Sequence, residues 1–81
     1  MYEDARMTQT TIDMLLLLFE HEGYSSGELS LISGINRNGI KAYMRLFEKM
    51  GYGEFTIFDG MYHFWFSPDG RKRAQELEDS N

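Results

Sequence analysis

The sequence predicts a small α+β domain in which three helices precede a two-stranded hairpin and a short C-terminal helix. Apolar runs with helix-start signals fill the first 50 residues, and glycines separate them. Two β-rich runs then flank Asp59-Gly60, which is the strongest short signal for a hairpin turn. We expect an N-terminal tail over residues 1–9 and a single domain over residues 10–81.

The composition favours a folded domain and excludes several classes of function. The chain has 81 residues, 42% of them hydrophobic and 15% aromatic, and its net charge of −5 excludes a protein that is basic throughout. It has no cysteine, which excludes disulfides and thiolate metal sites. The longest apolar run, 14–19, has six residues, far fewer than the ~20 of a membrane span, and the acidic start does not resemble a signal peptide. We expect a cytoplasmic protein without a membrane contact, metal or cofactor.

The first helix is expected over Thr11–Glu22, with Thr10 as N-cap and Asp13 as the acid of a capping box. Leu15–Leu18 occupy every face of such a helix. A helix of this kind is buried on more than one side.

The next two helices are short and close together. Ser25 and Glu28 have capping-box spacing and predict a helix that ends near Ser33, where Gly34 can adopt the left-handed conformation. Asn36 is the expected cap of a third helix over 37–50, closed by Gly51. Because Asn38-Gly39 is also a turn signal, this helix could begin two residues later.

The hairpin should pair Gly53–Phe58 with Met61–Phe66, so that Phe58 faces Met61. One face is wholly apolar and is expected to cover the core: Phe55, Ile57, Tyr62, Phe64 and Phe66. The other face is mixed, and Trp65 should be partly uncovered on it. Ser67-Pro68 then begins a last helix that runs to about Glu78.

The spacing around the second turn points to a family. Leu29 lies five residues before Gly34 and Ile40 six residues after it, where a helix-turn-helix needs inward contacts. With the hairpin that follows, the chain resembles the winged helix-turn-helix superfamily over about Thr10–Leu77, although Ser30 stands where the family usually has alanine. This resemblance implies a transcription regulator that binds double-stranded DNA with the third helix in the major groove.

Three segments carry narrower resemblances. Residues 43–52 (YMRLFEKMGY) look like the end of the recognition helix in small bacterial regulators. Residues 62–66 (YHFWF) resemble the second wing strand of fimbrial phase-variation regulators, and residues 67–71 (SPDGR) resemble the segment after the wing in MarR- and PadR-type repressors.

The third helix also indicates DNA binding without reference to a family. Its four basic residues recur every four positions and form one stripe, opposite the apolar residues. They are Arg37, Lys41, Arg45 and Lys49. Residues 35–53 carry four basic residues and one acidic residue, whereas residues 1–34 carry one basic and six acidic. The alternative interpretation of the stripe is an ordinary solvated helix face.

Further DNA contacts are expected at two places. Asn36, Arg37 and Asn38 lie at the helix start, which meets base edges in a major groove. Arg71, Lys72 and Arg73 could contact phosphates, or they could pair with the acidic residues at 76, 78 and 79. Since one recognition helix contacts few base pairs, we expect a homodimer joined through the first and last helices.

The hairpin supports an alternative function. It carries Glu54 and Asp59 but no Lys or Arg, and Phe58 and Met61 at its tip are expected to be exposed. These features favour a protein-interaction domain that modulates another regulator through the wing tip. An enzyme is not expected, because His21 and His63 are the only histidines and no serine has a base beside it in the sequence.

Overall fold

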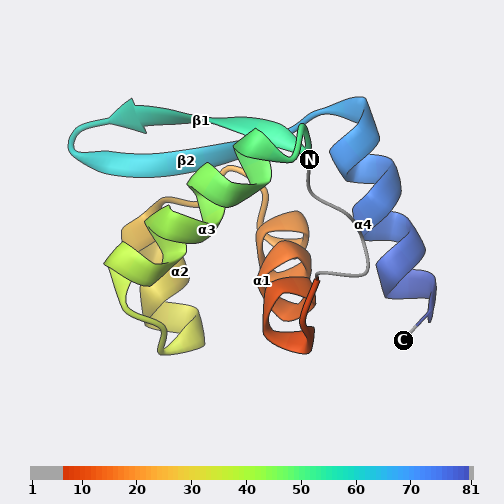
Figure 1. The fold of residues 1–81 in the computed structure, drawn as a ribbon. Helices are drawn as coiled ribbons and strands as arrows, with labels where there is room; N and C mark the ends of the chain where they lie inside the picture. The colour runs from red at the N-terminus through yellow and green to blue at the C-terminus, as the bar shows by residue number, and fades with distance from the viewer. Residues whose placement is uncertain (1–6, 81) are drawn as a thin grey trace.

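The computed structural model describes residues 7–80 (Figure 1). Residues 1–6 of the predicted tail, and residue 81, lie outside the described residues. The elements in chain order are α1 (Gln9–Glu20), α2 (Ser26–Ser33), α3 (Arg37–Lys49), β1 (Gly53–Phe58), β2 (Met61–Phe66) and α4 (Pro68–Ser80). The predicted order of elements is confirmed.

The two ends of α1 differ from the prediction. Thr8, and not Thr10, is the N-cap, and its side chain accepts a hydrogen bond from the Thr11 N–H. The predicted capping box is wrong as well, since Asp13 accepts a hydrogen bond from the side chain of Gln9. Both Thr8 and Thr10 precede the same apolar run, so the sequence pattern alone does not show which of them caps the helix. The helix ends at Glu20, two residues before the predicted end.

The segment from α2 to α3 follows the prediction closely. The capping box is present, because Glu28 Oε1 accepts from the Ser25 N–H at 2.8 Å and Ser25 Oγ accepts from the Glu28 N–H at 3.1 Å. Gly34 ends α2 with φ of 76°, a left-handed conformation that costs glycine little. Asn36 caps α3 through the Asn38 N–H, so the helix begins at Arg37 and the later start is wrong.

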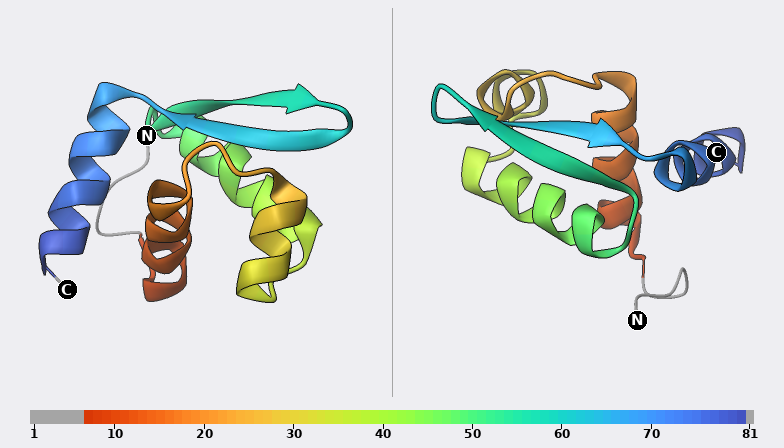
Figure 2. Two further views of the ribbon diagram at one scale, coloured as in Figure 1. Left: turned by 180° about the vertical axis from the view of Figure 1, so that it is seen from behind. Right: turned by 90° about the horizontal axis from the view of Figure 1, so that it is seen from above.

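The hairpin has the predicted register along its whole length, from Gly53 opposite Phe66 to Phe58 opposite Met61. Asp59 and Gly60 both have positive φ, 52° and 76°, as a two-residue type I′ turn requires. On its other edge β2 forms a bridge from His63 to Ser25. The strand β2 therefore lies between β1 and the start of α2, and the view from above shows the hairpin between α3 and the α1–α2 connection (Figure 2).

The core lies where the helices meet the inner half of the hairpin. Its buried residues come from all four helices and β2: Met14, Leu15, Leu18, Leu29, Ile40, Met44, Phe47, Phe64, Phe66 and Ala74. Ile57, which was expected to cover the core, is 59% exposed. The reason is that the tip of the hairpin projects beyond the helices (Figures 1 and 2), so its apolar face extends further than the core beneath it. Trp65 is 44% exposed, which confirms that it is partly uncovered.

The last helix packs on α1, which also contacts α3 (Figure 1). Leu15 and Leu18 are buried, and Leu16 and Leu17 are half-buried. At the start of α4, a Cβ on the buried Gly70 would overlap the carbonyl oxygen of Tyr52. Within residues 7–80, no helix combines the length and the apolar character needed to cross a bilayer.

Candidate nucleic-acid interface

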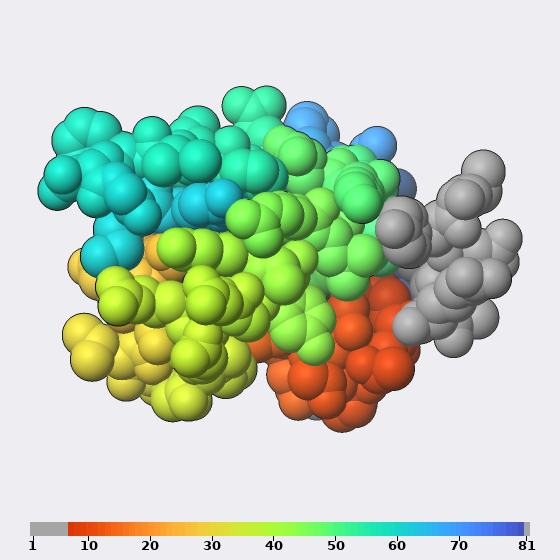
Figure 3. All heavy atoms as spheres, turned by 60° about the vertical axis from the view of Figure 1, so that its left-hand side comes forward, coloured from red at the N-terminus to blue at the C-terminus, as the bar shows by residue number. Residues whose placement is uncertain are grey.

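The basic stripe predicted on α3 lies on one face of the molecule. Arg37, Arg45 and Lys49 are exposed and Lys41 is half-exposed, whereas Ile40 and other apolar residues of α3 point into the core. Figure 3 shows this helix across the middle of one face, with the hairpin above it and α2 beside its start. Among the described residues, none of the four cations forms an ion pair. No carboxylate of the described residues therefore neutralises the charge of the stripe.

The start of α3 brings four of the predicted site residues together. Asn36, Arg37, Asn38 and Lys41 line an open hollow of about 370 Å³, together with Ser30 of α2. Asn36 uses its side-chain oxygen for the helix cap, and Ser30 Oγ donates to the carbonyl oxygen of Ile35 at 2.6 Å. Ser30 was not predicted as a site residue. The available signal for it was that serine stands there in place of the alanine that is usual in the family, since serine adds a polar hydroxyl.

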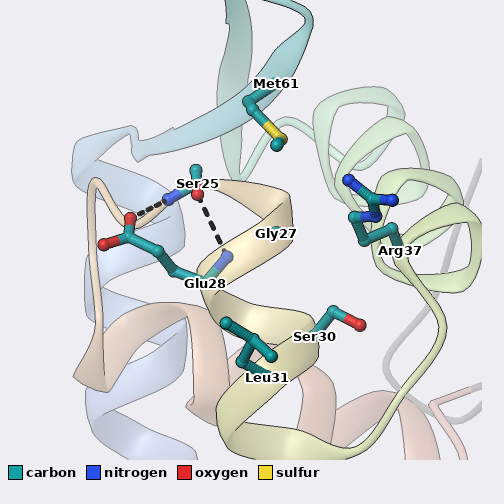
Figure 4. Close-up of a pocket in the computed structure, with 7 residues that line it drawn as sticks. All are labelled: Ser25, Gly27, Glu28, Ser30, Leu31, Arg37 and Met61. Carbon is teal, nitrogen blue, oxygen red and sulfur yellow. Dashed lines mark hydrogen bonds between the residues drawn. The ribbon is translucent and has the colours of Figure 1, made fainter.

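Arg37 also borders a second hollow, which lies between α2 and the hairpin (Figure 4). Arg37 and Met61 lie on two sides of this hollow of about 440 Å³, with Gly27 and the capped start of α2 between them. Hydrogen bonds from Ser25, first from its backbone and then from its side chain, lower the pKa of the Glu28 carboxyl. Glu28 therefore stays ionised to lower pH than an ordinary glutamate, and it supplies the only acidic group lining this hollow among the described residues.

Two residues of the stripe contact the hairpin through Tyr62. Arg45 Nη2 donates to the Tyr62 hydroxyl oxygen at 2.8 Å, and its Cζ lies 5.2 Å from the centre of the Tyr62 ring. Lys41 Nζ lies at the same distance from that centre. The sequence assigned Tyr62 only to the apolar face of the hairpin. The contact joins two elements that are distant in the sequence, and no local pattern indicated it.

The tip of the hairpin differs from the prediction on one side only. Phe58 is 74% exposed, as expected. Met61 was expected to be exposed but is half-buried, because its side chain packs over Gly27 and its sulfur accepts a hydrogen bond from Ser26 Oγ. The alternation that placed Met61 opposite the core was correct, but α2 reaches under that face of the hairpin.

The basic residues of α4 are not grouped with the stripe. Arg71 forms an ion pair with Glu22 at 2.9 Å, and the same oxygen of Glu22 accepts from the Phe66 N–H. Arg73 contacts Glu76 at 3.5 Å, one of the acids named as an alternative partner, and Lys72 is exposed. Their contribution to DNA binding stays a prediction.

Comparison with known proteins identifies the fold. No protein-family model matches the sequence, and no curated protein sequence is similar to it. Among solved structures, Streptococcus pneumoniae FabT in complex with DNA has a TM-score of 0.79 at 10% identity, over 98% of this chain and 57% of FabT. Bordetella bronchiseptica BpsR, whose DNA binding is regulated by 6-hydroxynicotinic acid, gives 0.76 at 14% identity, over 96% of this chain and 61% of BpsR.

Staphylococcus aureus MepR, a transcription regulator of the multidrug efflux pump MepA, gives a TM-score of 0.75 at 11% identity, over 96% of this chain and 60% of MepR. The chain thus spans about three-fifths of the length of each of these three proteins. The agreement confirms the predicted α+β class and the winged helix-turn-helix fold, with α2 and α3 as the helix-turn-helix and the hairpin as the wing.

Proposed function

We propose that the chain is a transcription regulator that binds double-stranded DNA sequence-specifically, with α3 in the major groove. The observation that carries the proposal is the exposed stripe of Arg37, Lys41, Arg45 and Lys49, whose charge no carboxylate of the described residues neutralises. Cations in this arrangement release counterions from the phosphates and gain affinity from doing so. A merely solvated helix face usually mixes acids with bases, and only Glu48 interrupts this one.

The residues of the interface have two roles. Asn36, Arg37 and Asn38 lie at the start of α3, where the side chains of a recognition helix meet base edges. Lys41, Arg45 and Lys49 follow along the same face and contact phosphates. Arg71, Lys72 and Arg73 reinforce binding at the flank of the site.

The similar structures support this function. FabT has been solved in complex with DNA, and MepR is a transcription regulator. These neighbours are DNA-binding proteins and regulators rather than enzymes, which also supports a non-catalytic role. Dimeric regulators bind DNA sites made of two symmetric half-sites, and by analogy the chain acts as a homodimer that places one α3 on each half-site.

The test is a binding titration followed by a selection. The chain should bind random duplex DNA at about 50 mM salt and lose affinity steeply towards about 300 mM, because its binding is driven by phosphate contacts. Selection from a random duplex library should then enrich one sequence pattern. Salt-independent or absent binding would contradict the proposal and favour the protein-interaction alternative.

Arg37→Glu should weaken binding to the selected sequence by about 100-fold, since it removes a base contact and adds repulsion. Lys72→Glu makes the same change of charge on an exposed position of α4 and should cost less than about tenfold. Fluorescence anisotropy gives both affinities, and far-UV circular dichroism should be unchanged in both variants. Equal losses would mean that α3 is not the main contact.

A further inference from the structure

Tyr62 of β2 lies against two cations of α3. Lys41 and Arg45 are one helical turn apart, and both their charged groups lie 5.2 Å from the centre of the Tyr62 ring. Arg45 also donates to the Tyr62 hydroxyl oxygen at 2.8 Å. Through Tyr62 the wing, which has no Lys or Arg of its own, contacts the basic stripe.

The Tyr62 ring is itself held in place. It stacks on Phe55 of the neighbouring strand, with ring centres 4.9 Å apart and ring planes at 13°. The Tyr62 backbone N–H donates to the buried Ser26 Oγ at 3.1 Å, which connects it to the start of α2. Because its ring is stacked on Phe55 and its backbone is bonded to α2, Tyr62 gives Arg45 a rigid partner.

We propose that Tyr62 is a positioning residue for DNA binding, which holds Arg45, and with it Lys41, in the conformation that contacts phosphates. The inference rests on the proposed function. An exposed arginine has several rotatable bonds, and their freedom is lost when it binds. Tyr62 accepts from one of the five N–H donors of Arg45, so this freedom is lost before DNA arrives and the other donors stay available. The wing thus contributes to affinity through α3.

A double-mutant cycle tests whether Tyr62 acts through Arg45. Tyr62→Phe removes the hydroxyl but keeps the ring that packs on Phe55. It should weaken DNA binding by about threefold to tenfold, the cost of ordering one long side chain on binding. In an Arg45→Ala background the same change should have no effect on affinity. The salt dependence should be flatter in Arg45→Ala but unchanged in Tyr62→Phe, because only the former removes a phosphate contact.

One control variant and two further measurements separate positioning from a structural role. Tyr43→Phe removes the same atom from a tyrosine on the core side of α3, where the ring packs near Phe47, and it should change affinity less than about twofold. In the DNA-free protein, NMR relaxation of the Arg45 side-chain Nε–H should show an ordered group that becomes mobile in Tyr62→Phe. The melting temperature of Tyr62→Phe should stay close to that of the wild type.

The outcomes are distinct. If the wild-type chain binds DNA and the effects of Tyr62→Phe and Arg45→Ala simply add, or if Tyr62→Phe has no effect, this inference is overturned while the proposed function stands. If the wild-type chain binds no DNA, the proposed function and this inference both fail. Loss of the Tyr62→Phe effect in the Arg45→Ala background, with Arg45 ordered only in the wild type, supports it.

Discussion

At residue 70 the contact between α4 and the connection from α3 to β1 leaves no room for a side chain. Gly70 packs directly on the backbone of Tyr52, and the Tyr52 carbonyl oxygen in turn accepts from the Ser67 N–H at 2.9 Å. Ser67 Oγ accepts from the Gly70 N–H at 3.0 Å and donates to the Gly51 carbonyl oxygen. The segment SPDGR therefore has a structural explanation: Ser67 and Gly70 join the end of α3 to the start of α4.

We expect Gly70→Ala to destabilise the fold by about 3 kcal/mol, because backbone must move to accept the new methyl group. Gly39→Ala is the matched control. A Cβ at residue 39 would meet the Ile35 side chain at an ordinary 3.5 Å, and alanine is favoured within a helix, so this change should stabilise by up to ~1 kcal/mol. Chemical denaturation of both variants measures the two effects, and a neutral Gly70→Ala would mean that α4 packs differently.

Glu28 makes the stability of α2 depend on pH. Its pKa is lowered in the folded protein by hydrogen bonds from Ser25, so its contribution is complete above the ordinary value of 4.5 and is lost as the pH falls below that value. Glu28→Gln keeps a side-chain oxygen that can accept from the Ser25 N–H but removes the titration. Between about pH 7 and about pH 3 the melting temperature of this variant should fall less than that of the wild type. An equal fall in the melting temperature of the two proteins would show that Glu28 is not the group responsible.

At the scale of elements, α3 and the wing are expected to contribute unequally to phosphate binding. Lys49→Ala should flatten the slope of log affinity against log salt by about 0.9, the value of one phosphate contact. Asp59→Asn should leave that slope unchanged or slightly strengthen binding. Asparagine is chosen because Asp59 has a positive φ of 52°, which asparagine tolerates. Binding isotherms over a range of salt concentrations measure both slopes, and a flatter slope in Asp59→Asn would assign phosphate contacts to the wing.

Elements were more predictable than the contacts between them. The α2 capping box, the turn at Gly34 and the hairpin register are local, and each was correct. Alternation also assigned Ile57 and Met61 to the right faces, but it could not tell how far each face is covered. The burial of Met61 depends on the position of α2 relative to the hairpin. The exposure of Ile57 depends on how far the hairpin extends beyond the core.

In the candidate site, too, the local pattern was predictable and the contact between elements was not. The stripe on α3 follows from a four-residue period alone, and its exposure agrees with that expectation. The contact between Arg45 and Tyr62 joins residues 17 positions apart on different elements. No spacing rule connects a helix with a strand in this way, because the contact depends on the angle at which the hairpin crosses α3.

For the whole molecule we expect a dimer, with a sedimenting mass of twice 9.5 kDa at micromolar concentration. The leucines at 15–18 support a dimer less strongly than the sequence suggested, because α4 of the same chain covers part of α1. The main reason is that two copies of α3 on one DNA face double the contact. Sedimentation velocity measures the mass, and a 9.5 kDa species under these conditions would contradict the prediction.

The hydrogen bonds that join the hairpin to α2 and to the α1–α2 connection are made by β2, whereas α3 packs along β1. On β2, Tyr62, His63 and Phe66 hydrogen-bond to Ser26, Gly23 and Glu22, whereas Thr56–Phe58 of β1 are exposed. The two strands should therefore differ in mutational tolerance. Replacements in the outer half of β1 should alter the rest of the fold little, while replacements in β2 should disturb α2 and the connection that precedes it. Over evolutionary time, relatives of this chain should diverge faster in the outer half of β1 than in β2.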